Sequence, residues 1–183
     1  MKKLFLFSFF FLFIYSYCFQ NSAAQIKLNE GFEDAQFPPE GWTEAAVLPA
    51  GGNWISSKRM SESGKGCAVS NFSQTISNNF LITKSFIPSA GDSLSFSLRQ
   101  TFWNIYKDTF NVYISTTDSL PSSMNTLLAH FYDGLNYPAP LGYGNYSVSL
   151  NSFAGQKVWI GFQHINVNGD NVRLDNIKAG SPI

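Results

Sequence analysis

The chain has 183 residues, and its 12 Lys and Arg residues balance 12 Asp and Glu residues, so its formal charge at pH 7 is zero. Aromatic residues make up 16% of the sequence and charged residues 13%. This composition offers no basic excess for nucleic acid binding. The length fits one domain of ordinary size, able to bury a substantial core.

The first 24 residues have the pattern of a secretory signal peptide. Lys2 and Lys3 form a basic start, residues 4–19 form an apolar run, and cleavage is expected after Ala24. A spanning helix needs about 20 apolar residues, so the run is short for an anchor, and an uncleaved anchor remains the alternative. We expect a secreted or cell-surface domain over residues 25–183, with bacterial-type export and no stable membrane insertion after cleavage.

Removal of the leader leaves one cysteine, Cys67, so no internal disulfide can form. Cys67 lies between Gly66 and Ala68, which favours a small buried thiol over an activated nucleophile. Cleavage also removes two Lys and no acidic residue, leaving ten basic against twelve acidic residues. The exported domain must therefore take its stability from its core, and a bound metal would add to it.

From residue 25 onward, apolar residues recur with a period of two, and no segment shows a sustained helical period. Strands are predicted at 67–72, 79–86, 93–98, 110–115, 126–132, 145–150, 158–163 and 171–178, separated by turn-forming residues. Each strand has one apolar face, which a second sheet must cover. We predict an all-β fold, a two-sheet antiparallel β-sandwich of the jelly-roll kind.

Acidic residues lie beside aromatic residues at both ends of the exported chain. Glu33 and Asp34 stand near its beginning, and Asp175 stands near its end. The apolar spacing slips after Asp175, as a β-bulge would cause, and bulges re-aim side chains. Calcium takes six to eight oxygen ligands, so the two ends can share a cation if they are neighbours. The alternative is that Glu33 caps a turn and Asp175 pairs with Arg173 or the backbone.

Three segments carry a resemblance to a known family: Glu30-Gly31-Phe32-Glu33-Asp34, Gly66-Cys67-Ala68-Val69-Ser70 and Arg173-Leu174-Asp175-Asn176-Ile177. Together they resemble the cleaved-adhesin, or choice-of-anchor J, domain of bacterial secreted proteins and of the haemagglutinin regions of gingipain proteases. The likeness extends over residues 28–179. It implies a galactose-binding-like or MAM-like jelly roll, and an adhesin or accessory module that binds glycans, haem proteins or matrix proteins outside the cell.

In the resembling family, a cation joins the glutamate after the first aromatic residue to the aspartate of the last strand. This pairing implicates Glu33 and Asp175 as ligands of a structural calcium ion, and we add Asp34 and Asn53 as further candidates. Many family members carry a run of Asp and Gly before the second Trp. Residues 48–53 differ from that pattern, which argues against a second calcium site there.

Exposed aromatic side chains are candidates for ligand binding because they offer a large contact area at a small entropic cost. We assign four of them as candidate ligand-binding residues: Trp103, Tyr106, Tyr137 and Tyr143. The last two lie in a loop rich in Gly and Pro over 133–144, and long loops on rigid sandwiches often carry recognition. Tyr113 and Trp159 are also expected on the outward face, where packing across the sheet is the alternative.

The sequence lacks the G-x-S-x-G, H-E-x-x-H and G-x-x-x-x-G-K-[ST] motifs. Its histidines, His130 and His164, fall within predicted strands, and Asp108, Asp118 and Asp133 fall in turns. We therefore predict a non-catalytic adhesion module for a glycan or an extracellular protein, with a structural calcium ion. A secreted hydrolase of unrecognised type and a structural component of an envelope assembly are the alternatives.

Overall fold

The computed structural model describes residues 25–48, 53–137 and 141–181, and the predicted signal peptide lies outside these ranges. The described chain is almost entirely strand, with two short 3-10 turns. Its strands are β1 Ile26–Glu30, β2 Thr43–Ala46, β3 Trp54–Ser57, β4 Cys67–Ser70, β5 Ser77–Ile82, β6 Ser93–Gln100, β7 Thr109–Ser115, β8 Thr126–Tyr132, β9 Gly144–Ser149, β10 Trp159–Asn166 and β11 Val172–Gly180, and its turns are η1 Pro121–Ser123 and η2 Asn151–Phe153.

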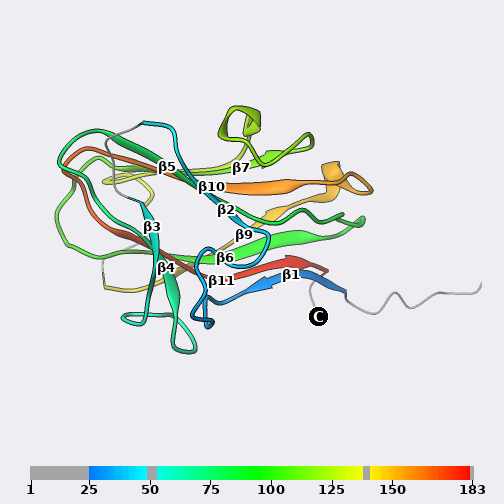
Figure 1. Cartoon of the computed structure of the whole chain (residues 1–183), viewed down its shortest axis with the longest axis horizontal. Helices are drawn as coiled ribbons and strands as arrows, with labels where there is room; N and C mark the ends of the chain where they lie inside the picture. The colour runs from blue at the N-terminus through cyan, green and yellow to red at the C-terminus, as the bar shows by residue number, and fades with distance from the viewer. Residues whose placement is uncertain (1–24, 49–52, 138–140, 182–183) are drawn as a thin grey trace, which may run out of the picture.

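The strands form two antiparallel sheets that pack face to face (Figure 1). One sheet has six strands in the order β3-β4-β11-β6-β9, with β1 also paired to β11. The other has five strands in the order β2-β5-β10-β7-β8. The chain passes from one sheet to the other between β6 and β7 and again between β10 and β11, as in jelly rolls. The predicted two-sheet antiparallel sandwich is confirmed.

Apolar side chains from alternate positions of both sheets meet in one core. Leu94, Phe96 and Leu98 of β6 face Phe110 of β7 and Phe162 of β10, and all five are buried. The ring of Phe96 meets that of Phe162 edge-on at 5.7 Å, and Phe162 stacks on Phe110 at 6.3 Å. Such aromatic pairs add about 0.5–1.5 kcal/mol each beyond the area they bury. The core therefore supplies the cohesion that disulfides give to many secreted domains.

All eight strands predicted from the period-two pattern are present, with ends shifted by up to four residues. The predictions missed β1, β2 and β3, which are short and carry few buried side chains. Cys67 is buried, as predicted, and burial raises the pKa of its thiol. Within the described residues, no helix is long and apolar enough to cross a bilayer.

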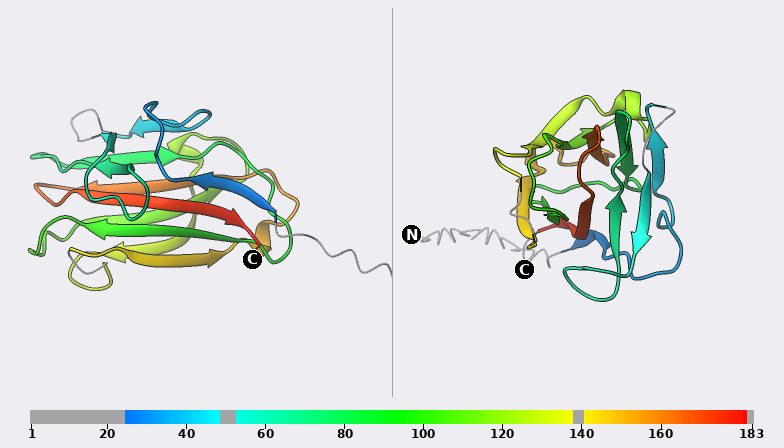
Figure 2. Two further views of the ribbon diagram at one scale, coloured as in Figure 1. Left: turned by 90° about the horizontal axis from the view of Figure 1, so that it is seen from below. Right: turned by 90° about the vertical axis from the view of Figure 1, so that its left-hand side faces the viewer.

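Strand β11 organises the six-stranded sheet because it is long enough to hold two neighbours along one edge. β4 pairs with residues 172–174 and β1 with residues 177–180, while β6 runs along the opposite edge. The predicted bulge is present, because the β6 register shifts between Asp175 and Lys178. Figure 2 shows β1 in blue beside the red β11. A gap between β1 and β4 thus falls opposite the bulge.

Candidate functional site

The two acidic ends of the chain meet in the gap between β1 and β4. Where β1 ends at Glu30, the chain turns at Gly31 and Phe32, and Phe32 has a φ of 58°. The carboxylates of Glu33 and Asp175 converge on Gly31. A Cβ on that glycine would lie 3.7 Å from Glu33 Oε1 and 3.9 Å from Asp175 Oδ1. The structure therefore brings together the two residues that the family resemblance implicated.

Backbone amides of the loop between β3 and β4, residues 58–66, also reach both carboxylates. Asp175 Oδ2 accepts from the amides of Glu62 at 2.8 Å and Ser63 at 3.2 Å, and Glu33 Oε2 accepts from Lys65 at 2.7 Å. Thus the backbone part of our alternative for Asp175 is observed. Its other part is not, because Arg173 instead donates to Ser57 Oγ and to the carbonyl of Arg59.

The electrostatics of Asp175 are those of a buried anion beside a second anion. The side chain is completely buried, and burial raises the pKa of its carboxyl. Backbone amides of Asn176, Ser63 and Glu62 oppose that rise in pKa, whereas the Glu33 carboxylate adds to it. Among the described residues, no Lys or Arg forms an ion pair with either carboxylate. A cation between the two carboxylates would offset both the desolvation of Asp175 and its repulsion by Glu33.

Glycine allows the loop to close on Glu33. A Cβ on Gly64 would collide with the Glu33 carboxylate, and a Cβ on Gly66 would collide with the carbonyl of Phe32. Gly64 also has a φ of 59°, which glycine adopts without strain. The Ser63 hydroxyl donates to Asn176 Oδ1 at 2.7 Å, so further oxygens surround the pair. The donor set, carboxylates with nearby hydroxyl and carbonyl oxygens, suits a hard cation.

The other two candidate metal ligands lie elsewhere. Asp34 is exposed and lines a small separate pocket with Glu30 and Lys84. Asn53 precedes β3 and accepts from the amide of Asn71, at the opposite end of the β3–β4 hairpin from the 58–66 loop. No group of three or more His, Cys, Asp or Glu within the described residues is placed to hold a metal ion.

The four candidate ligand-binding aromatics do not form one surface. Trp103 is 71% exposed in the loop between β6 and β7, and Tyr106 is half-buried in the same loop. The Tyr137 ring packs against the core, and its buried hydroxyl has no hydrogen-bond partner among the described residues. Tyr143 donates to the carbonyl of Met60 at 2.8 Å and lies under Arg99. Tyr143 therefore braces the 58–66 loop.

Asp108 and Asp133, predicted from the sequence to lie in turns, are buried together with Asp170 beneath the loops beyond β6, β8 and β10. Asp133 accepts from Gln100 Nε2 at 2.8 Å and from the amides of Tyr106 and Lys107. Asp170 accepts from the amides of Thr101, Phe102 and Asn171, and Asp108 accepts from the amide of Asp170. They fasten these loops to one another. No local pattern could have revealed them, since the donors come from distant segments.

A serine, a histidine and an aspartate also line up inside the sandwich. Ser70 Oγ lies 2.9 Å from His164 Nδ1, and His164 Nε2 lies 3.8 Å from Asp108 Oδ2. All three residues are at most 1% exposed, so a substrate cannot reach the Ser70 hydroxyl. The arrangement is a buried polar contact between β4 and β10.

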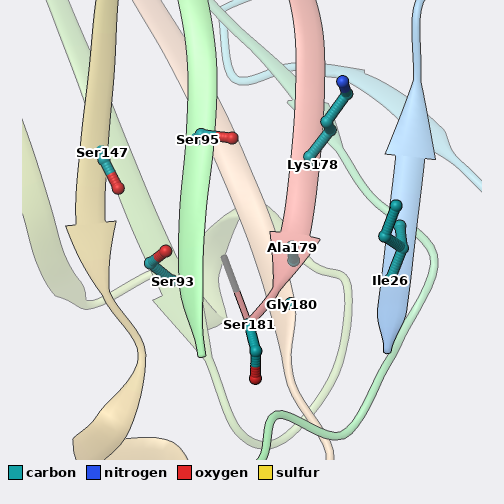
Figure 3. Close-up of a pocket in the computed structure, with 8 residues that line it drawn as sticks. All are labelled: Ile26, Ser93, Ser95, Ser147, Lys178, Ala179, Gly180 and Ser181. Atoms are coloured by element: carbon teal, nitrogen blue, oxygen red, sulfur yellow. The ribbon is translucent and has the colours of Figure 1, made fainter. Parts of the chain in front are cut away.

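The outer face of the six-stranded sheet holds a shallow groove of about 350 Å³ between β1, β11, β6 and β9 (Figure 3). Serine hydroxyls from β6 and β9 line one side, and Lys178 and Ile26 line the other. None of its lining residues is aromatic. The groove therefore offers hydroxyls and one cationic side chain, but no flat apolar surface for a ligand.

Comparison with known proteins places these features in context. No family model matches the chain. The chain is 28% identical over 168 residues to Hemagglutinin A of Porphyromonas gingivalis, a match that covers 78% of the chain and 6% of that protein. Hemagglutinin A of the W83 strain is 27% identical over the same length. The chain thus spans less than a tenth of the length of these curated relatives.

Solved structures give the same fold. The K3 cleaved adhesin domain of Lys-gingipain from P. gingivalis W83 superposes with a TM-score of 0.72 at 22% identity, over 86% of this chain and all of that domain. The chain is thus similar in sequence to a haemagglutinin and shares its fold with a gingipain adhesin domain. The carbohydrate-binding module TmCBM61, solved with β-1,4-galactotriose, shares the fold at a TM-score of 0.59 and 12% identity, over 83% of this chain and 94% of that one. The resemblance stated from the sequence is confirmed.

Proposed function

We propose that this chain is an adhesin domain, a non-catalytic adhesion module that binds a glycan or an extracellular protein. The observation that carries the proposal is the sequence match to Hemagglutinin A across most of the chain. The fold adds support, because the superposable structures include Lys-gingipain adhesin domains and the modules described as binding β-1,4-galactotriose and xylan. Within the described residues, the buried state of Ser70, His164 and Asp108 also favours binding over hydrolysis.

The proposal includes export and display outside the cell. The basic start, apolar run and small residues of positions 1–24 have the layout of a signal peptide. Both curated relatives are named as haemagglutinins, a name that describes action on the surface of other cells. Extracellular glycans and proteins are therefore the partners that this module would meet.

The proposal also includes a structural calcium ion held by Glu33 and Asp175. Two converging carboxylates without a basic partner among the described residues support it. Two carboxylates do not supply the six to eight oxygens that calcium takes, so carbonyl, hydroxyl and water oxygens would complete the coordination. The ion would tie the segment after β1 to β11 and to the 58–66 loop. Its role would be stability, since it would join three segments that are distant in the sequence.

Binding tests the functional part of the proposal. The purified protein is applied to arrays of glycans and of extracellular matrix proteins and to whole erythrocytes, and the same preparation is screened for glycosidase and peptidase activity. We expect saturable binding to at least one array class or to erythrocytes, without turnover. Hydrolysis that survives purification and is lost in Ser70→Ala would contradict the proposal, as would the absence of binding on every surface.

Calcium-dependent thermal unfolding tests the structural part. A calcium concentration one hundred times the dissociation constant stabilises a folded protein by about 2.7 kcal/mol, which raises the melting temperature of a domain of this size by roughly 5–10 °C. We expect that rise in the wild type, and its loss in Glu33→Gln and Asp175→Asn. Asp34→Asn is the matched control, because Asp34 lies in a different pocket. A rise that persists in both carboxylate variants would rule out this site.

A further inference from the structure

Four polar side chains form a continuous ladder across the outer face of the five-stranded sheet. They come from neighbouring strands: Asn78 of β5, Gln163 of β10, Asn111 of β7 and His130 of β8. Gln163 Nε2 donates to Asn78 Oδ1 at 2.8 Å, and Asn111 Nδ2 donates to Gln163 Oε1 at 2.7 Å. His130 Nδ1 donates to Asn111 Oδ1 at 2.7 Å. Each side chain therefore fixes the orientation of the next.

The ladder is rigid and still has hydrogen-bonding capacity. Asn111 and Gln163 are 6% and 7% exposed, so their amide planes are held by packing as well as by bonds. A side-chain amide nitrogen carries two hydrogens, and each ladder bond uses one of them. Asn78 and His130, at the two ends, are more exposed. The outer face thus presents a preorganised row of donors and acceptors.

An apolar groove adjoins the ladder. Phe80 and Met124 form its floor, Tyr113 lies beside them half-exposed, and turn η1 forms one wall. Gly161 makes room for this floor, because a Cβ there would lie 2.8 Å from Met124 Sδ and 3.3 Å from a Phe80 ring carbon. The groove encloses about 460 Å³ and reaches Asn78 and Gln163 at its polar side.

The lining of this groove is neutral. The described residues that line it are amides, a serine, a tyrosine and apolar side chains, with no Asp, Glu, Lys or Arg among them. A charged ligand would find no counter-charge there, whereas a neutral polyhydroxylated ligand would find amide partners and a ring to lie against. The groove on the other sheet has Lys178 and no aromatic lining (Figure 3). The two outer faces therefore differ in the ligand class they suit.

We propose that the outer face of the five-stranded sheet is the ligand site, and that its ligand is a neutral oligosaccharide. A sugar ring lies against Tyr113 over the apolar floor, and hydroxyls of the chain bond to Asn78, Gln163, Asn111 and His130. Because neighbouring strands are about 4.8 Å apart, the ladder spans roughly 14 Å, which one sugar ring does not cover. The proposal rests on the adhesion function above and names its site and ligand class.

Titration of defined sugars tests the site. The probes are neutral β-1,4-linked gluco-, xylo- and galacto-oligosaccharides from di- to hexasaccharide, with a heparin-derived hexasaccharide as the charged comparison. Calorimetry gives affinity, and NMR follows the side-chain amide signals of Asn78, Asn111 and Gln163 in the wild type. We expect binding of at least one neutral series, tighter for longer chains, with shifts of those amide signals. The charged hexasaccharide should not compete.

Substitutions locate the binding. Tyr113→Ala should weaken binding by at least about tenfold, as for a central aromatic anchor, and Tyr113→Phe is its matched control because it keeps the ring. Asn78→Ala and His130→Ala, at exposed ends of the ladder, should each weaken binding severalfold. Ser95→Ala lies outside the groove and should leave affinity unchanged, whereas Trp103→Ala tests the competing candidate in the loop between β6 and β7. If a variant does not fold, the wild-type shifts of the Asn78, Asn111 and Gln163 amide signals still decide whether the sugar lies on this face.

The outcomes separate this inference from the adhesion function. If a neutral sugar binds but shifts no ladder amide, or only Trp103→Ala weakens it, this site is wrong and the adhesion function stands. If no neutral series binds while erythrocytes or a matrix protein do, the ligand class is wrong and adhesion again stands. If the protein binds none of the sugars, proteins or cells, both proposals fail.

Discussion

The most telling single residue is Asp175, a completely buried carboxylate whose described surroundings include a second carboxylate and no paired basic side chain. Burying an ionised carboxylate is costly unless hydrogen bonds or a counter-charge compensate. Three backbone amides, those of Glu62, Ser63 and Asn176, supply part of that compensation. These hydrogen bonds therefore compensate only part of the cost of burying the Asp175 carboxylate.

The raised pKa of Asp175 gives a pH-dependent prediction. With the folded-state pKa above the usual 3.8, the native state holds the proton more tightly than the unfolded chain. The Asp175 carboxyl therefore destabilises the native state least below pH 3.8, where it is protonated in both states. Its contribution to the free energy of unfolding falls as pH rises through the folded pKa. In EDTA, the unfolding free energy of the wild type minus that of Asp175→Asn should therefore decrease from pH 4 upward. Urea titrations measure it, and a flat difference would contradict the raised pKa.

Asp133 supports a prediction of a different kind, because its carboxylate accepts hydrogen bonds from three donors in two segments. Asp133→Ala would leave Gln100 Nε2 and the amides of Tyr106 and Lys107 without this partner. Leaving buried donors unpaired costs about 1–3 kcal/mol, so we expect about 2 kcal/mol of destabilisation by urea unfolding. Asp133→Asn, which keeps one carbonyl oxygen, is the control and should lose less. Equal losses would mean that the hydrogen bonds are not the cause.

At the scale of elements, the bulge in β11 decides where the cation candidate forms. Asn176 sits in it with a φ of 51°, a left-handed conformation that costs most L-residues about 1–2 kcal/mol. Asn176→Ala and Asn176→Gly both remove the bond from Ser63 Oγ, but only glycine adopts this φ freely. We expect Asn176→Gly to be more stable than Asn176→Ala by about 1 kcal/mol in thermal unfolding. The reverse order would mean that the bulge relaxes in the variants.

The strands show which elements a sequence can reveal. β7 alternates apolar and polar residues over its whole length, and β6 and β10 do so over residues 93–98 and 160–163, since one face of each strand lies on the core. By contrast, β1 and β2 are short, and only one of their residues is fully buried. They are strands because β11 and β5 offer free edges, which is a property of distant segments. Periodicity could therefore predict the sandwich but not its first three strands.

The candidate sites follow the same rule. Glu33 and Asp175 could be predicted, because the family resemblance and the phase slip in β11 are both written in local sequence. Asn53 could not be excluded as a cation ligand from the sequence, since only the antiparallel pairing of β3 and β4 places it at the end of the hairpin far from Glu33 and Asp175. The ladder on the other sheet was missed for a similar reason. Its members, such as Gln163 and Asn111, become partners only through strand register.

At the scale of the whole molecule, the cation candidate and the groove belong to different sheets. Asp175 lies on the outer side of the six-stranded sheet, under the 58–66 loop, whereas the ladder lies on the outer side of the five-stranded sheet. Facing sheets of a sandwich pack about 10 Å apart, and here the aromatic core fills that space. Neither carboxylate of the pair lines the groove.

This separation predicts that calcium controls stability without controlling affinity. Chelation should lower the melting temperature by roughly 5–10 °C. At 20 °C, with the protein still folded by circular dichroism, the dissociation constant for a bound neutral oligosaccharide should change by less than about twofold, a difference worth under about 0.5 kcal/mol. Calorimetric titrations with and without EGTA measure it, and Asp175→Asn in calcium should behave like the chelated wild type. A large loss of affinity in the folded, chelated protein would instead mean that the cation lies in, or is coupled to, the ligand site.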